Sequence, residues 1–112
     1  MLRESHTAIV ARNERWEGEA ATEPFEAGWA SEAVFFLRAL AAEGPTGDGR
    51  AHVQISPDGM RWVDEGTSAK MPGAADGIAV LRVAHFGSWL RLRVSLPSGA
   101  RLTPIVTLAL KA

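Results

Sequence analysis

The 112-residue sequence contains no cysteine and no tyrosine. Without cysteine, disulfide bonds and thiolate metal ligands are excluded, and the composition suits a reducing compartment. No apolar run approaches the ~18–20 residues of a membrane-spanning helix. The N-terminus carries charges within its first four residues and lacks the apolar stretch of a signal peptide. We therefore expect a soluble, cytoplasmic protein that does not bind membranes.

The charge pattern gives no indication of a polyanionic partner such as a nucleic acid. Net charge is −1, and lysine and arginine are spread along the chain without a long basic run. A nucleic-acid-binding domain of this size normally gathers basic residues on one face or along one element. We expect no nucleic-acid partner.

Signatures of common catalytic and cofactor sites are also missing. There is no G-x-S-x-G motif, and the glycine-rich stretch GPTGDG (residues 44–49) lacks the lysine of a phosphate-binding loop. Three histidines, His6, His52 and His85, have no metal-binding spacing, although a site assembled from them in space remains an alternative. We expect no catalytic residue, no metal and no cofactor. A small enzyme that uses His52, His85 and a carboxylate is the least favoured hypothesis.

What the sequence does contain is a regular alternation of short apolar segments and turn signals. Gly or Pro interrupts the chain at residues 43–49, 56–59, 72–77, 86–88 and 97–99. This rhythm is typical of many short strands in a sandwich or barrel. The pattern predicts one all-β domain over residues 1–112, an antiparallel, jelly-roll-like β-sandwich with room for one short helix.

The clearest strand is WLRLRVSL (residues 89–96), in which apolar and polar residues alternate strictly. Period-two alternation predicts one face toward the core and the other toward solvent. The inward set is Leu90, Leu92, Val94 and Leu96, and the outward set is Trp89, Arg91, Arg93 and Ser95. Further strands are expected over residues 6–12, 52–55, 77–83 and 103–110, with Pro104 at a strand start or on a sheet edge.

SEAVFFLRALAAEG (residues 31–44) fits two structures. Its helix propensity is high, with Ser31 as N-cap and Gly44 beyond the end. We favour a strand, because the segment leads through a glycine-rich loop directly into residues 51–56, as a hairpin requires. As a strand it directs Val34 and Phe36 away from the core, so the sheet would have a second apolar face that needs a cover.

The stretch QISPDGMRW (residues 54–62) matches a type I turn at Ser-Pro-Asp-Gly. Ser56 can bond the backbone ahead of it, Pro presets φ, and Gly59 accepts a positive φ. We therefore interpret Asp58 as a structural turn residue rather than a metal ligand or an acid. The turn would join residues 51–56 to 60–65, with Trp62 on the core face beside Val53 and Ile55. A bulge at Gly59 would reverse that side.

ISPDGMRW followed by FGSWLRLRVSL resembles the core pattern of discoidin-like (factor V/VIII type C) β-sandwich modules and related short bacterial β-sandwich proteins, over residues 51–96. In those modules a strand enters an S-x-D-G-x-x-W-like hairpin, and a later strand carries an aromatic-x-Arg-Leu pattern. The resemblance implies a β-sandwich and, beyond it, carbohydrate binding. The chain is shorter than a typical discoidin domain and lacks the terminal cysteines of extracellular members, which puts sugar or lipid binding in doubt.

Four tryptophans are many for a chain of this size, and Trp89 shares its strand face with Arg91 and Arg93. Exposed tryptophan beside arginine is typical of faces that bind sugars or proteins; alternatively, Trp89 packs under the arginine stems. We predict Trp89, Arg91 and Arg93 as ligand-binding residues. The favoured function is a non-catalytic binding or assembly module that forms homo-oligomers or binds another protein; carbohydrate binding is the alternative.

Overall fold

The structure is a computed structural model that describes residues 5–112. Residues 1–4, whose charges entered the expectation about a signal peptide, lie outside this range. The strands are β1 (Ser5–Arg12), β2 (Glu19–Ala21), β3 (Phe25–Glu26), β4 (Glu32–Glu43), β5 (Arg50–Ser56), β6 (Val63–Lys70), β7 (Ile78–Ala84), β8 (Trp89–Ser95) and β9 (Arg101–Lys111). One 3₁₀ turn, Thr46–Asp48, precedes β5. Within residues 5–112 no helix has the length and apolar character needed to cross a membrane.

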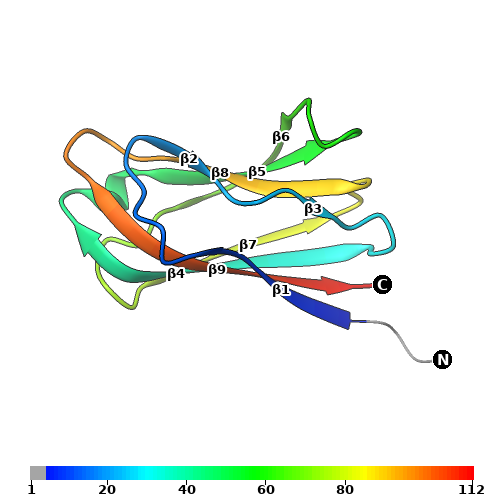
Figure 1. Ribbon diagram of the computed structural model, residues 1–112, viewed down its shortest axis with the longest axis horizontal. Coiled ribbons are helices and arrows are strands. Elements are labelled where there is room, and N and C mark those ends of the chain that lie inside the picture. The colour runs from blue at the N-terminus through cyan, green and yellow to red at the C-terminus, as the bar shows by residue number, and fades with distance from the viewer. Residues whose placement is uncertain (1–4) are drawn as a thin grey trace.

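The strands form two antiparallel sheets that face one another, as Figure 1 shows. One sheet has the order β1-β9-β4-β7, and the other has β2-β8-β5-β6, with β3 also pairing with β8. Because β2 and β3 border the same strand, they act as one interrupted edge strand. The chain then crosses from sheet to sheet after β1, β3, β4, β6, β7 and β8, which is the order of a jelly roll. The predicted fold class is confirmed.

The core lies between the sheets and is built by alternation along each strand. On β8, Leu90, Leu92 and Val94 are fully buried, and Leu96 just beyond the strand is buried as well. The opposite sheet contributes Phe35 and Leu37 from β4, also fully buried. The leucine row predicted from the sequence therefore lines the interior.

The ambiguous segment at residues 31–44 is a strand, β4, as favoured from the sequence. It lies in the centre of its sheet and pairs with both β7 and β9. Val34 and Phe36 point outward, opposite buried Phe35. Helix propensity is overruled here because pairing on both sides satisfies the backbone and buries an entire face of the segment.

Pro104 departs from the expectation, since it lies inside β9 rather than at its start, and β9 is a central strand. The neighbouring strand β1 pairs with β9 only as far as Ile105, which faces Arg12. Two residues before Pro104, Leu102 exchanges backbone hydrogen bonds of 3.0 and 2.7 Å with Trp16 on that same side. Proline has no backbone N–H to donate. The nitrogen of Pro104 faces a gap between these two pairings, so no hydrogen bond of the ladder is lost.

The loop between β4 and β5 passes close to the loop that precedes β9. Gly44 has φ +72°, and a Cβ on it would collide with the carbonyl oxygen of Gly99. Nearby, the buried hydroxyl of Thr46 donates a 2.7 Å hydrogen bond to the carbonyl of Pro72. Gly44 is therefore required both by its dihedral angle and by its neighbour.

We predict that Gly44→Ala lowers the free energy of unfolding by about 3 kcal/mol, because it adds a backbone collision to the strain of a left-handed residue. Gly18→Ala is the matched control, since Gly18 also has positive φ (+62°) but has open space around its Cβ position. The control should lose about 1 kcal/mol. Chemical denaturation measures both values; equal losses would contradict the proposed close contact.

Candidate functional site

The Ser-Pro-Asp-Gly loop satisfies its own polar groups. The Ser56 hydroxyl accepts hydrogen bonds from the backbone N–H groups of Asp58 (3.2 Å) and Gly59 (2.9 Å). The Asp58 carboxylate accepts from the backbone N–H groups of Met60 and Arg61, each at 2.9 Å, and from the Arg61 guanidinium at 2.7 Å. Gly59 has φ +79°, as its turn position requires. The carboxylate thus has the local structural role predicted for it.

These hydrogen bonds also lengthen the loop. The strand β6 begins only at Val63, so residues 57–62 lie outside both strands. The prediction that Trp62 lies on the core face beside Val53 and Ile55 is wrong. Trp62 lies on the outer face, where the guanidinium carbon of Arg91 is 4.4 Å from its ring centroid. The turn at Asp58 adds residues that a minimal hairpin lacks and so changes the side on which Trp62 emerges.

The three predicted ligand-binding residues, Trp89, Arg91 and Arg93, alternate with buried leucines and therefore share the outer face of the sheet β2-β8-β5-β6. The structure surrounds them with residues from three other segments. We call this surface the arginine face and define it by Glu19, Gln54, Trp62, Asp64, Trp89, Arg91 and Arg93.

Arg91 is held on two sides. Its guanidinium stacks on Trp62, and its Nε donates a 2.8 Å hydrogen bond to Oε1 of Gln54. The amide nitrogen of Gln54, itself a buried residue, donates in turn to Oδ1 of Asp64 at 2.9 Å. Partial burial, together with the neighbouring charge of Arg93, lowers the pKa of Arg91 below its usual value.

Arg93 lies between two carboxylates. Its terminal nitrogens are 3.3 Å from Asp64 and 3.5 Å from Glu19, and Glu19 also accepts a 3.0 Å hydrogen bond from the Ser95 hydroxyl. The hydrogen bond from Gln54, followed by the hydrogen bond and the positive charge of Arg93, lowers the pKa of Asp64. These groups alternate hydrogen-bond donors with acceptors across the face.

Trp89 is half-buried and supports the hairpin loop. A Cβ on Gly59 would lie 3.2–3.4 Å from atoms of the Trp89 indole, so the loop backbone rests against the ring. Trp62 and Gln54 were missed from the sequence as members of this face. Gln54 belongs because β5 and β8 pair it with Arg91, and that register cannot be seen in either strand alone.

The outer face of the other sheet is apolar. We call it the apolar face and define it by Ile9, Val34, Phe36, Ile78, Val80 and Ile105. Phe36 pairs with Val80 on one side and with Thr107 on the other, and Thr107 pairs with Ile9. One row therefore crosses all four strands. Phe36 is 41%, Ile9 53% and Ile78 59% exposed, an unusual arrangement for the outside of a small domain.

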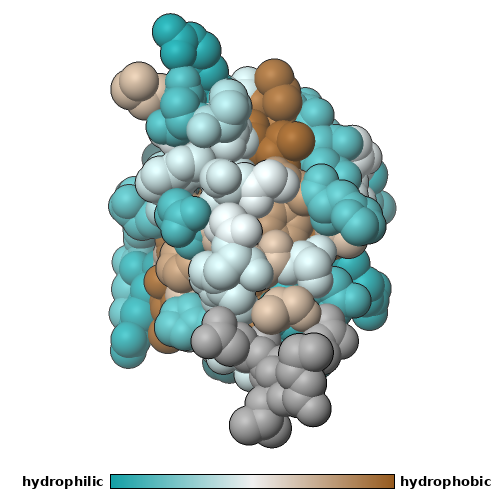
Figure 2. Space-filling model, turned by 90° about the vertical axis from the view of Figure 1, so that its right-hand side faces the viewer, coloured by the Kyte–Doolittle hydropathy of each residue, from teal (hydrophilic) through white to brown (hydrophobic). Residues whose placement is uncertain are grey.

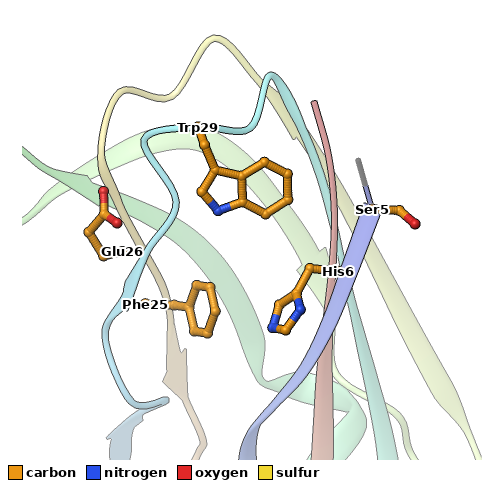
Figure 3. A pocket seen from close by; sticks show the side chains of 5 residues that line it. All are labelled: Ser5, His6, Phe25, Glu26 and Trp29. Carbon is orange, nitrogen blue, oxygen red and sulfur yellow. The ribbon is translucent and has the colours of Figure 1, made fainter. Parts of the chain in front are cut away.

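A hollow of about 410 Å³ lies where the edge strands β1 and β3 of the two sheets approach each other. Figure 3 shows the rings of Trp29, Phe25 and His6 converging on it, whereas the side chains of Ser5 and Glu26 point away. The His6 and Phe25 rings stack with centroids 6.0 Å apart. His6 is therefore exposed but not merely solvated, because its ring links the edges of the two sheets.

The other two histidines come from different parts of the fold. His52 is on β5, and His85 follows β7 in a loop. No group of three or more His, Cys, Asp or Glu side chains within residues 5–112 could hold a metal ion. The hypothesis of a three-histidine site is thus not supported by the arrangement of these side chains.

The end of the sandwich at which β1 begins and β9 ends is mostly polar. Figure 2 shows teal and pale side chains over this end, with brown, apolar atoms gathered in its upper part at the height of the β5–β6 hairpin. An apolar hollow of about 400 Å³ lies in that hairpin region, lined by Ile55, Val63 and Phe86 among others.

No family model matches the sequence, and a search of curated proteins finds no match. Among solved structures, the chain is similar to the SPBc2 prophage-derived protein YomS, with a TM-score of 0.65 and 8% identity over 100% of this chain and 96% of that one. It is also similar to the PBSX exported protein XepA, with a TM-score of 0.58 and 12% identity over 97% of this chain and 36% of that one.

A third similar chain comes from the infectious bursal disease virus Gt strain, with a TM-score of 0.55 and 8% identity over 97% of this chain and 32% of that one. The protein thus spans nearly all of YomS but about a third of the other two chains. At such low identity these likenesses establish the fold alone. They support a small β-sandwich and not the narrower resemblance to discoidin modules.

We predict that Asp58 stabilises the fold at neutral pH and loses this effect in acid. Hydrogen bonds from the backbone of Arg61, then of Met60, lower the pKa of Asp58 from 3.8 to about 2. A lowered folded-state pKa stabilises above the unfolded value, and the contribution disappears as pH falls from about 4 to about 2. Thermal unfolding of wild type and Asp58→Ala should therefore differ at pH 7 and converge near pH 2.

The control for this experiment is Asp48→Ala, which removes an exposed carboxylate from another loop. Its unfolding temperature should follow that of the wild type across the same pH range. A difference between wild type and Asp58→Ala that persists unchanged at pH 2 would contradict the role assigned to the charged carboxylate.

Proposed function

We propose that this protein is a non-catalytic assembly module that forms homo-oligomers through its apolar face. The observation that carries the proposal is the row of Ile9, Phe36 and Val80 across the outside of a four-stranded sheet. A monomer would leave these side chains in water. A second copy could cover them without any change of fold.

The size of the face suits such an interface. Strands lie about 4.8 Å apart and rise about 3.3 Å per residue, so four strands over about six residues span about 20 by 20 Å. This projection of about 400 Å² is about half of the ~800 Å² that each partner buries in a standard interface, so a dimer would bury the whole outer face together with its polar margin. Two copies related by a two-fold axis would present the same patch to each other.

Charges on this sheet support a face with a dry centre and a polar margin. Arg38 and Arg82 lie two residues on either side of the central row, and Arg38 is 3.7 Å from Asp76 in the loop before β7. An apolar centre with a charged rim is the usual anatomy of a specific interface. The similar chains from prophage-derived and viral proteins are compatible with a structural role.

We expect the wild type to be a dimer or larger at micromolar concentration and Phe36→Lys to be a monomer. The new charge would lie near Arg38 and Arg82 and could not be buried against a second copy without a large desolvation cost. Size-exclusion chromatography with light scattering measures the mass, and thermal unfolding checks that the variant is folded.

Met60→Lys is the matched control, because Met60 is an exposed apolar residue, 76% accessible, on the opposite sheet's hairpin. It makes the same chemical change and should leave the oligomer intact. A wild type that stays monomeric at hundreds of micromolar would contradict the proposal. An oligomer that dissociates in Met60→Lys but persists in Phe36→Lys would contradict it as well.

Carbohydrate recognition by the arginine face is the second candidate. The observation that favours it is the alternation of donors and acceptors around Trp62, from Arg91 and Gln54 to Asp64. Sugar hydroxyls both donate and accept, and the apolar side of a sugar ring packs against aromatic rings.

We predict for this candidate that a neutral sugar quenches tryptophan fluorescence in the wild type and that Trp62→Phe weakens binding severalfold. Trp29→Phe, which alters the aromatic hollow instead, should bind as the wild type does. Loss of binding in Trp29→Phe alone would assign the sugar to the hollow and contradict this candidate, as would the absence of any response on a glycan array.

A further inference from the structure

The guanidinium of Arg91 is fixed in place before any ligand arrives. The Trp62 ring lies against its flat side at 4.4 Å, and Gln54 accepts the hydrogen of its Nε at 2.8 Å. An exposed arginine normally loses side-chain entropy when it binds a ligand. Here stacking and the Nε bond have already restricted it, so less is lost on binding.

The two terminal nitrogens of Arg91 have no hydrogen-bond or ion-pair partner within residues 5–112. The two carboxylates that share this hydrogen-bond network with Arg91 already have other partners. Asp64 accepts from Gln54 and Arg93, and Glu19 accepts from Arg93 and Ser95. Arg91 therefore presents one open end of its planar fork, the end that matches the two oxygens of an oxyanion.

Space for a ligand lies beside Arg91, on the side of β8 that faces β2. A hollow of about 480 Å³ is lined by Arg91, Arg93, Glu19, Ala20 and Ala21. It is a shallow depression that is open to solvent, so a ligand there would be held by the side chains at its margin. On one side the wall is the short strand β2, where Ala21, paired with Arg93, presents a small side chain on this face.

The local charge balance also favours an anion. Arg93 is matched by Asp64 and Glu19, whereas Arg91 has no carboxylate partner within the described chain. On the neighbouring strand, Arg50 donates to the neutral hydroxyl of Ser68 at 2.9 Å. On the arginine face itself the two carboxylates equal the two arginines in number, but both carboxylates contact Arg93, and Arg50 beside the face adds a further positive charge. The lowered pKa of Arg91 agrees with an unmatched, partly desolvated charge.

We propose that the open fork of Arg91 binds an oxyanion, a carboxylate carried by a small ligand that lies in the hollow between β2 and β8. Arg91 makes the contact, and Arg93 adds a second positive charge at the same hollow. Trp62 and Gln54 are positioning residues that hold the guanidinium. This site lies on the opposite sheet from the proposed oligomer interface and does not depend on it.

The test is an NMR titration of the arginine Nε–Hε signals, with the Arg91 signal assigned by its loss in Arg91→Lys. Four probes are added at constant ionic strength: acetate, inorganic phosphate, galacturonate and galactose. We expect the three anions to shift the Arg91 signal and galactose to leave it unchanged. Tighter binding of galacturonate than of acetate would identify an acidic sugar as the source, and equal binding would identify a general oxyanion site.

Arg91→Lys keeps the charge but removes the fork, so calorimetry should find the affinity for galacturonate reduced about tenfold, which corresponds to about 1.4 kcal/mol. Arg101→Lys is the matched control, because Arg101 is bound to Glu17 at 2.6 Å away from the face, and it should bind as the wild type does. Unfolding temperatures check that both variants are folded.

Two results would overturn the proposal. One is an Arg91 signal that no anion shifts at tens of millimolar. The other is an equal response to galactose and galacturonate, which would leave hydroxyl recognition as the explanation. Repeating the titration with the Phe36→Lys variant separates this outcome from oligomerisation, because a lost interface would leave the Arg91 response in place.

Discussion

The two sheets enclose one apolar interior, and this arrangement sets the direction of the side chains along each strand. Each strand alternates, so burying Leu90 and Leu92 of one sheet against a layer that includes Phe35 and Leu37 of the other commits every second residue to the outside. Side chains at those outward positions cannot join the core. The two outer faces therefore present side chains that are available for contact with a ligand or another protein.

The two outer faces differ in the polarity of their side chains. On the sheet β2-β8-β5-β6, charged and aromatic side chains bond one another through Gln54, Arg91 and Asp64, so the face is polar and internally connected. On the sheet β1-β9-β4-β7, Phe36 and Ile9 of the central row are about half exposed to solvent. A satisfied polar network suits recognition of a small ligand, whereas an uncovered apolar layer suits contact with another protein surface.

The hairpin loop between β5 and β6 connects the turn at Asp58 to the arginine face. Hydrogen bonds to Ser56 and Asp58 stabilise an extended hairpin loop and delay the start of β6 until Val63. Because β6 begins at this residue, the Trp62 side chain points outward, where its ring contacts Arg91. The hydrogen bonds of the Asp58 carboxylate thereby help to decide which aromatic ring the arginine stacks on.

Four features could be predicted from the amino-acid sequence: the fold class, the inward leucine row, the turn role of Asp58 and the outward direction of Phe36. Each follows from period-two alternation or from local backbone demands. Even β4, whose composition favours a helix, was recoverable from its neighbours along the chain. Three features could not be predicted in this way: the side on which Trp62 emerges, the position of Pro104 inside β9 and the pairing of Gln54 with Arg91. Those features depend on register between strands that are distant in sequence, and a shift of one residue reverses every side chain.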